Sequence, residues 1–234
     1  MMKLFWAKTG LFQSVMTHGL VSGCVCGHLM RNYLAPGTRA LVAELLGISE
    51  EALIAFVSYL VSLHDIGKIE YHFQCKDPQM EKQLREMGIG KSTVGREYVR
   101  HEKTGASAIS RIWERQEQDE DARDVFFSLI GAHHQTDYGK GARSEEPLFA
   151  EGRQKLEEMM RSRFLPAPDW MLSEIPDGEG VFEAVLLGMM ILSPHAYLQD
   201  ACFTVFIDTT PEWQMRIVRA LENPKWCMYL GRKN

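Results

Sequence analysis

Apolar residues recur at helical spacing through most of this chain. The clearest case follows Ser49, a residue type that favours a helix N-cap, and two acidic residues, Glu50 and Glu51. From Ala52 to Leu63 the chain is apolar on most of a helical surface, which predicts a buried helix that runs directly into residue 64. Similar patterns predict further helices at about 11–34, 101–116, 122–134, 148–160 and 181–192.

Polar, Gly-rich or Pro-rich stretches separate these segments. We therefore expect a mainly α-helical domain, a helical bundle, over residues 1–193. Beyond it the pattern changes and is typical of a strand, a short helix and a second strand or extended segment at 197–207, 212–221 and 225–233. The sequence thus predicts a short β-α-β-like appendage over residues 194–234.

Composition narrows the class of protein. The chain has 234 residues, 45% of them hydrophobic, which is enough for one sizeable core. Its formal net charge of −5 excludes a broadly basic nucleic-acid binder, so a polyanion would be held by bound metal and a local basic patch. Five cysteines without a CxxC pair favour a reducing compartment, and we interpret Cys24 and Cys26 as packing residues.

The sequence has no run of about 20 apolar residues and no signal-peptide pattern at its start. We therefore expect a cytoplasmic protein that does not contact a membrane.

The candidate chemistry centres on His64 and Asp65. An imidazole next to a carboxylate offers a divalent metal one nitrogen ligand and one oxygen ligand that can bridge two ions. The pair alone is weak evidence, because neighbouring His and Asp residues also form hydrogen-bonded pairs at helix ends. Further candidate ligands are spread through the sequence: His18, His101, His133 and His134.

Hydrolysis of a phosphodiester at neutral pH requires a strong nucleophile and relief of charge on the phosphoryl oxygens, and two cations supply both. Imidazole ligands favour Mn, Ni, Co or Fe over Mg. If the predicted helix continues, Lys68 lies about one turn beyond Asp65, where its ammonium would approach the scissile phosphate. The alternative for Lys68 is a solvated surface lysine.

The order and spacing of these residues resemble the HD nuclease domain of the CRISPR-associated helicase-nuclease of type I interference systems. The resemblance covers about residues 1–192. It rests on His18, the run His64-Asp65-Ile66-Gly67-Lys68, His101 and the doublet His133-His134. Supporting matches are Phe5-Trp6-Ala7-Lys8, Thr17-His18-Gly19-Leu20, Phe73-Gln74 and Arg100-His101-Glu102.

This resemblance implies metal-dependent cleavage of single-stranded DNA and a site with two divalent metal ions. One ion would be held by His18, His64 and Asp65. The second would be held by Asp65, His101, His133 and His134. Asp65 and Lys68 would be the catalytic residues, with Lys68 assisting at the phosphate.

The chain departs from the family pattern after Leu192. Family members place a metal-binding aspartate after the last core helix, where this chain reads Ser193, Pro194 and His195. His195 would offer a substitute nitrogen donor, whereas Asp200 lies off the expected register.

Residues 194–234 resemble a fragment of the Cascade subunit that holds the 5′ handle of the guide RNA. The matching segments are 197–201, 223–226 and 229–233. The alternative is an ordinary tail of the helical domain with one hairpin-like addition. No G-x-x-x-x-G-K-[ST] loop is present in the sequence, so we expect any helicase to be a separate partner.

Three functions remain open from the sequence. The first is an active HD nuclease that acts on single-stranded DNA alongside a CRISPR helicase and the Cascade complex. The second is a catalytically weak or inactive HD module that binds Cascade or the helicase, because the last ligand aspartate is missing. The third is an HD phosphohydrolase of small nucleotides, which the vicinal histidines and the His-Asp-Ile-Gly-Lys run favour less.

Overall fold

The computed structural model describes residues 5–8, 13–89, 99–116, 120–132 and 146–165, together with residues 185, 186, 188, 189 and 193. These residues form eight α-helices, one 3-10 helix and a two-stranded sheet. The elements in chain order are β1 (Trp6–Lys8), β2 (Gln13–Ser14), α1 (Val15–Asn32), α2 (Pro36–Leu45), α3 (Glu50–Ser62), η1 (Ile66–Lys68), α4 (Tyr71–Gln74), α5 (Pro78–Glu86), α6 (His101–Arg115), α7 (Glu120–Ala132) and α8 (Pro147–Phe164). The prediction of a mainly α-helical bundle is confirmed.

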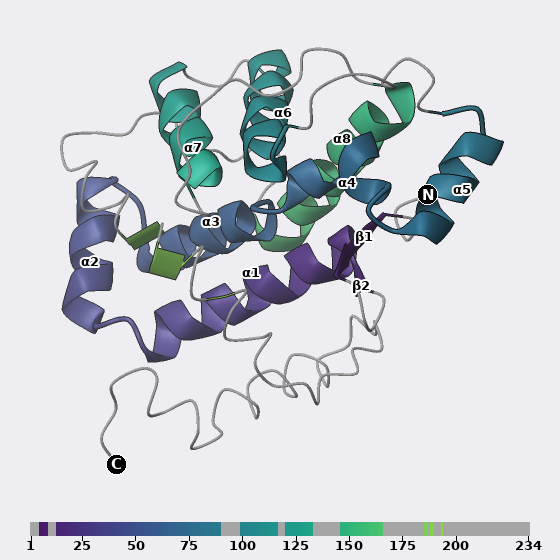
Figure 1. The fold of residues 1–234 in the computed structure, drawn as a ribbon. Helices are drawn as coiled ribbons and strands as arrows, with labels where there is room; N and C mark the ends of the chain where they lie inside the picture. Colours follow the sequence, from purple (N-terminus) through teal and green to yellow (C-terminus); the bar gives the residue numbers. More distant parts are fainter. Residues whose placement is uncertain are drawn as a thin grey trace.

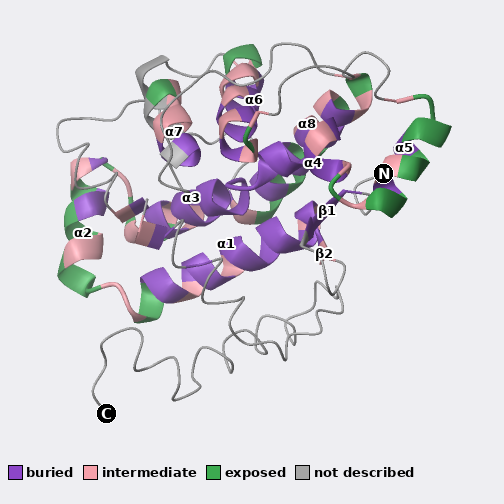
Figure 2. Cartoon of the chain, viewed as in Figure 1, coloured by how far each residue is buried: buried purple, intermediate pink, exposed green. Residues whose placement is uncertain are grey.

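Helices α1 and α3 lie side by side through the middle of the molecule (Figure 1). Both are buried over most of their length, whereas α2 and α5 are largely exposed (Figure 2). Glycines on one face of α1 allow this close packing: a Cβ at Gly19 would lie 2.3 Å from the carbonyl oxygen of Ser62, and one at Gly23 would lie 2.8 Å from that of Ser58. The buried pair forms the frame that carries the candidate ligands.

Helix α3 forms as its sequence predicts. The Ser49 hydroxyl accepts a hydrogen bond from the backbone N–H of Ala52 at 3.1 Å, and two glutamates occupy the first turn. The helix ends at Ser62, however, and the chain turns into η1 instead of continuing to Lys68. The end of the helix just before His64 agrees with the prediction, and Lys68 lies on η1 and not on a continuation of that helix.

A buried polar network ties α8 to α3 and α6. The Tyr59 hydroxyl donates to Glu157 at 2.5 Å and accepts from the indole N–H of Trp113 at 3.1 Å. Arg161 pairs with the same Glu157 at 2.6 Å. Burial raises the pKa of Tyr59 well above 10, which keeps this hydroxyl neutral and able to donate. The charges of Glu157 and Arg161 are thus compensated inside the core.

The short sheet was not predicted. Strands β1 and β2 pair antiparallel, with Trp6 opposite Ser14. The buried Gln74 amide donates to the carbonyl oxygens of Trp6 at 3.0 Å and Lys68 at 2.7 Å, so it connects β1 to η1. Strands this short show no alternation of apolar and polar residues that would reveal them in the sequence. The long-range hydrogen bonds of Gln74 hold β1 extended.

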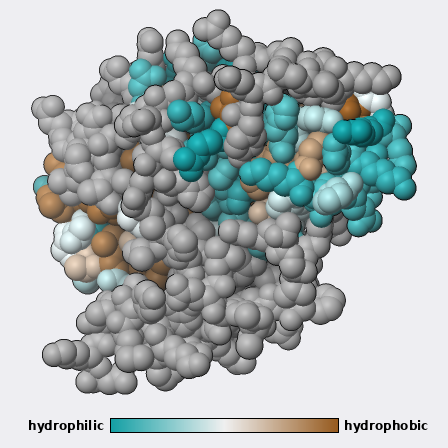
Figure 3. Space-filling view, viewed as in Figure 1, coloured by the Kyte–Doolittle hydropathy of each residue, from teal (hydrophilic) through white to brown (hydrophobic). Residues whose placement is uncertain are grey.

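Four of the other predicted helices are found with shifted ends, as α1, α6, α7 and α8, whereas most of the predicted helix at 181–192 lies outside the described residues. Helices α2, α4 and α5 were not predicted. On the face drawn in Figure 3, the described residues over α5 are hydrophilic and apolar residues gather over α2, where Leu41 is 48% exposed. No helix among the described residues is long and apolar enough to cross a membrane. The predicted appendage at 194–234 lies outside the described residues.

Candidate metal centre

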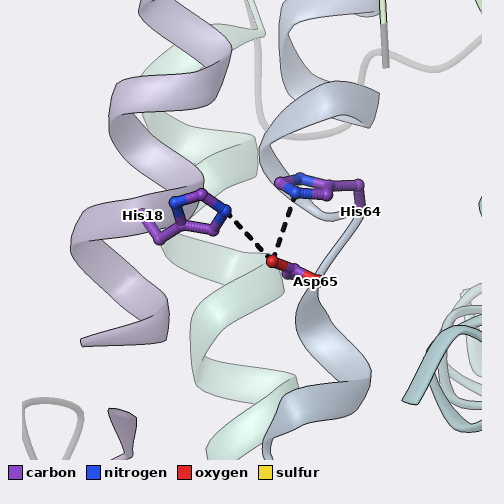
Figure 4. Close-up of side chains that lie close together, drawn as sticks. All are labelled: His18, His64 and Asp65. Carbon is purple, nitrogen blue, oxygen red and sulfur yellow. Dashed lines mark ion pairs between the residues drawn. The ribbon is translucent and has the colours of Figure 1, made fainter. Parts of the chain in front are cut away.

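Three separate elements bring the candidate ligands together. His18 lies on α1, His64 and Asp65 follow the end of α3, and His101 is the first residue of α6. Figure 4 shows the His18 and His64 rings pointing at the Asp65 carboxylate from two sides. His18, His64 and Asp65 are almost fully buried, and the His101 side chain is 13% exposed. Four of the predicted ligands therefore meet in the core.

The spacing of the first three side chains fits one metal ion. Nε2 of His18 lies 3.0 Å from Oδ2 of Asp65, and Nε2 of His64 lies 3.3 Å from the same oxygen. The potential ligand atoms of these residues all lie within 4.8 Å of one another. Nitrogen and oxygen atoms bound to one ion at about 2.1 Å, at octahedral to tetrahedral angles, are separated by about 3.0–3.4 Å. His18, His64 and Asp65 can hold a cation without large rearrangement.

The hydrogen bonding of His64 also favours a cation. Its Nδ1 lies 2.8 Å from the carbonyl oxygen of Val61, which can only accept, so the neutral ring carries its proton on Nδ1. The lone pair on Nε2 then faces the Asp65 oxygen. Two acceptors that face each other are stabilised by a cation between them, and a backbone carbonyl behind the ring is the usual support of a metal-binding histidine.

The second oxygen of Asp65 faces another direction. Oδ1 lies 3.1 Å from Nε2 of His101, while Oδ2 faces His18 and His64. A carboxylate that presents one oxygen to two imidazoles and its other oxygen to a third has the arrangement needed to bridge two metal ions.

Two glycines allow His101 to lie close to Asp65. Gly67 of η1 packs against the first turn of α6, where a Cβ on Gly67 would lie 1.8 Å from the carbonyl oxygen of His101 and 2.4 Å from the amide nitrogen of Gly105. Only a residue without a side chain fits this contact. The sequence shows both glycines, but nothing in its periodicity reveals that they touch.

Lys68 is buried, with 5% of its surface exposed, so the alternative of a solvated surface lysine is wrong. Its ammonium nitrogen lies 2.6 Å from Oδ2 of Asp65, and it sits over the ring of Phe73 with 5.5 Å to the centroid. The lysine compensates the buried carboxylate and points into the same centre as the histidines.

The structure does not test the remaining predicted ligands. His133 and His134 are outside the described residues, directly after the end of α7, which packs on α6. Ser193 is buried, and its hydroxyl donates to the carbonyl oxygen of Met189 at 2.6 Å and contacts Cys26. Cys26 follows His18 on α1 by eight residues, or about 12 Å. Ser193 therefore lies well away from His18, and His195 is outside the described residues.

Cys26 and Cys24 pack against the core as predicted. Burial raises the pKa of the Cys26 thiol to about 12, which is the behaviour of an inert packing residue. Sequence reasoning missed Glu102, which is fully buried next to His101; its position directly after a candidate ligand was the available signal.

The pKa of His18 leads to a pH-dependent prediction. Full burial lowers the pKa of this imidazole from 6.5 to about 4, and the neighbouring Asp65 offsets only part of that effect. The unfolded chain therefore binds more protons than the folded protein between these two pH values. Stability conferred by the neutral ring is complete above pH 6.5 and declines as the pH falls towards 4.

Between pH 7 and pH 5, wild type treated with a chelator should lose about 2 kcal/mol of unfolding free energy relative to His18→Gln, which has no imidazole to protonate. Urea unfolding of the two proteins at both pH values measures the difference. An equal change in wild type and variant would show that His18 is not the group responsible.

Comparison with known proteins identifies the family of this chain. The family model for the HD domain of Cas3 matches residues 6–193. The CRISPR-associated endonuclease/helicase Cas3 of Thermus thermophilus is 30% identical over an alignment of 198 residues that covers 80% of this chain and 21% of that protein. The chain thus spans about a fifth of the length of this relative.

Two solved structures share the fold. The Thermus thermophilus Cas3 HD domain in the presence of Ni2+ superposes with a TM-score of 0.67 at 22% identity, covering 99% of this chain and 90% of that one. A CRISPR RNA-guided surveillance complex, pre-nicking, contains a chain with a TM-score of 0.70 at 18% identity, covering 97% of this chain and 29% of that one. With the family model matched over residues 6–193, this chain belongs to the Cas3 HD-domain family.

Proposed function

We propose that this protein is a metal-dependent nuclease of CRISPR type I interference that cleaves single-stranded DNA. The observation that carries the proposal is the buried Asp65 carboxylate, which presents Oδ2 to His18 and His64 and Oδ1 to His101. Membership of the Cas3 HD-domain family supports it, as does the relative named as an endonuclease/helicase.

The residues that would hold two ions form two sets that share Asp65. His18, His64 and Asp65 would hold one ion; Asp65, His101, His133 and His134 would hold the other. When bound, two such ions lower the pKa of a water molecule and neutralise charge on a phosphodiester. The imidazole-rich set favours Mn, Ni, Co or Fe over Mg, and the related HD domain was solved in the presence of Ni2+.

The chain's own groups prepare the site for metal and substrate. The Val61 carbonyl holds the His64 ring in one tautomer, and burial keeps His18 neutral, so both nitrogens are available as ligands. Lys68 balances the charge of Asp65, and its ammonium would contact a phosphate oxygen once a substrate enters. Asp65 and Lys68 are therefore the proposed catalytic residues.

A separate CRISPR helicase and the Cascade complex are the proposed protein partners, and we place the protein in the cytoplasm. The partnership with Cascade is supported by the CRISPR RNA-guided surveillance complex, which contains a chain with the same fold as this protein. The competing function, a weak or inactive module that only binds Cascade or the helicase, is favoured by Ser193, which occupies the region where the resemblance expects a ligand aspartate. Residues 194–234, with their likeness to a Cascade subunit, would then provide the contact.

A cleavage assay with labelled single-stranded DNA distinguishes the proposed nuclease from the competing binding module. Protein stripped of metal should be inactive and should regain activity with Mn, Ni, Co or Fe more than with Mg, with two ions bound per chain. Double-stranded DNA and small nucleotides serve as control substrates. No cleavage with any metal, together with retained binding to Cascade or the helicase, would favour the competing function instead.

A further inference from the structure

Glu102 occupies an unusual position beside the metal centre. It is the second residue of α6, and its side chain is fully buried. Oε2 lies 3.3 Å from Nδ1 of His101, and Oε1 lies 2.5 Å from Nε of Arg100, whose side chain is 53% exposed. The carboxylate is thus held between the ligand histidine on one side and a guanidinium on the other.

A helix dipole alone does not explain this arrangement. An acidic residue in the first turn is favoured by the positive end of the helix, but that benefit is available at the surface, and burying a carboxylate costs free energy unless it is paired. Burial of Glu102 against an imidazole therefore calls for a specific partner, and the nearest polar atom of that ring is Nδ1.

The two nitrogens of His101 face two different carboxylates. Nδ1 faces Glu102 at 3.3 Å, and Nε2 faces Asp65 at 3.1 Å. A neutral imidazole has one proton and can donate to only one of them. Asp65 already accepts a hydrogen bond from the ammonium of Lys68, at 2.6 Å from Oδ2. The proton is therefore better placed on Nδ1, next to the Glu102 carboxylate, and the lone pair of Nε2 remains towards Asp65.

We propose that Glu102 is a positioning residue for the second metal ion. By accepting the Nδ1 proton it fixes the tautomer and the orientation of His101, so that Nε2 serves as a ligand beside Oδ1 of Asp65. Arg100 holds the other oxygen of Glu102, and the ring of Phe73 packs on His101 with centroids 5.5 Å apart. The inference rests on the proposed function, since it takes His101 as a metal ligand.

Metal titration of the full chain tests the proposal. In Glu102→Ala, one of two Mn2+ or Ni2+ ions should bind about 10–100-fold more weakly, which is the usual effect of removing a carboxylate behind a ligand histidine. Glu102→Gln keeps one acceptor and should lose less, and the ion at His18 and His64 should be unaffected. Glu157→Gln is the matched control, because Glu157 is equally buried but pairs with Tyr59 and Arg161.

A second readout needs no metal. The 15N spectrum of the histidine rings, with the His101 signals assigned by their loss in His101→Gln, should show a proton on Nδ1 in wild type and a mixture of tautomers in Glu102→Ala. Unchanged tautomers and unchanged affinity for both ions would overturn the proposal. If wild type binds no metal, the proposed function fails, while the tautomer comparison still decides whether Glu102 orients His101.

Discussion

Replacing Asp65 by Asn should remove metal binding and DNA cleavage together. The carboxylate faces His18 and His64 with one oxygen and His101 with the other, so a neutral amide weakens both ligand groups at once. Asn keeps the size of the side chain but has neither the charge nor a second oxygen. We expect cleavage to fall at least about a thousandfold, equivalent to about 4 kcal/mol of activation free energy, with neither ion retained.

The same change leaves the buried ammonium of Lys68 without its carboxylate. Breaking a buried ion pair costs about 3–5 kcal/mol, whereas replacing both partners is often nearly neutral. Asp65→Asn combined with Lys68→Met therefore separates folding from chemistry. The double variant should regain thermal stability and remain unable to bind metal or cleave DNA. Recovery of cleavage in the double variant, or two ions bound by Asp65→Asn, would contradict the assignment of Asp65.

The parts of the site that could be predicted are those encoded locally. Apolar spacing after Ser49 predicts α3, and the adjacency of His64 and Asp65, together with the further histidines in the chain, indicates a candidate pair of metal ligands. Because α1 and α6 are also strongly patterned, the sequence could assign His18 and His101 to helices. Their convergence on one carboxylate came from the resemblance to a family, since no periodicity gives the distance between helices.

The parts that could not be predicted depend on contacts between distant segments. Lys68 is placed by η1, which forms where Gly67 approaches α6, and local propensity does not show such a contact. Glu102 looks like an ordinary first-turn acid until its burial against His101 is seen. Gln74 gains its role only when β1 is beside it. In each case the decisive partner lies in another element or is defined only by burial.

Replacing Gly67 by Ala should destabilise the protein and displace His101 from the metal centre. The added Cβ would lie 1.8 Å from the carbonyl oxygen of His101 and 2.4 Å from the nitrogen of Gly105, and neither backbone atom can rotate away. Helix α6 must shift from η1, which costs about 3 kcal/mol and lowers Tm by about 6–12 °C for a chain of this size. The shift also moves His101 away from Oδ1 of Asp65.

Two other glycines make the test quantitative. A Cβ at Gly105 would lie 3.1 Å from the nitrogen of Gly67, so Gly105→Ala should cause a smaller loss of stability, whereas Gly37 in α2 has nothing within 4 Å and Gly37→Ala should cause none. In thermal unfolding, the Tm of Gly67→Ala should therefore be lower than that of Gly105→Ala and that of Gly37→Ala. In folded Gly67→Ala, metal titration should show one ion weakened and the ion at His18 and His64 retained. A Tm equal to that of Gly37→Ala would mean that η1 and α6 do not pack in this way, and the route by which His101 reaches Asp65 would have to be sought elsewhere.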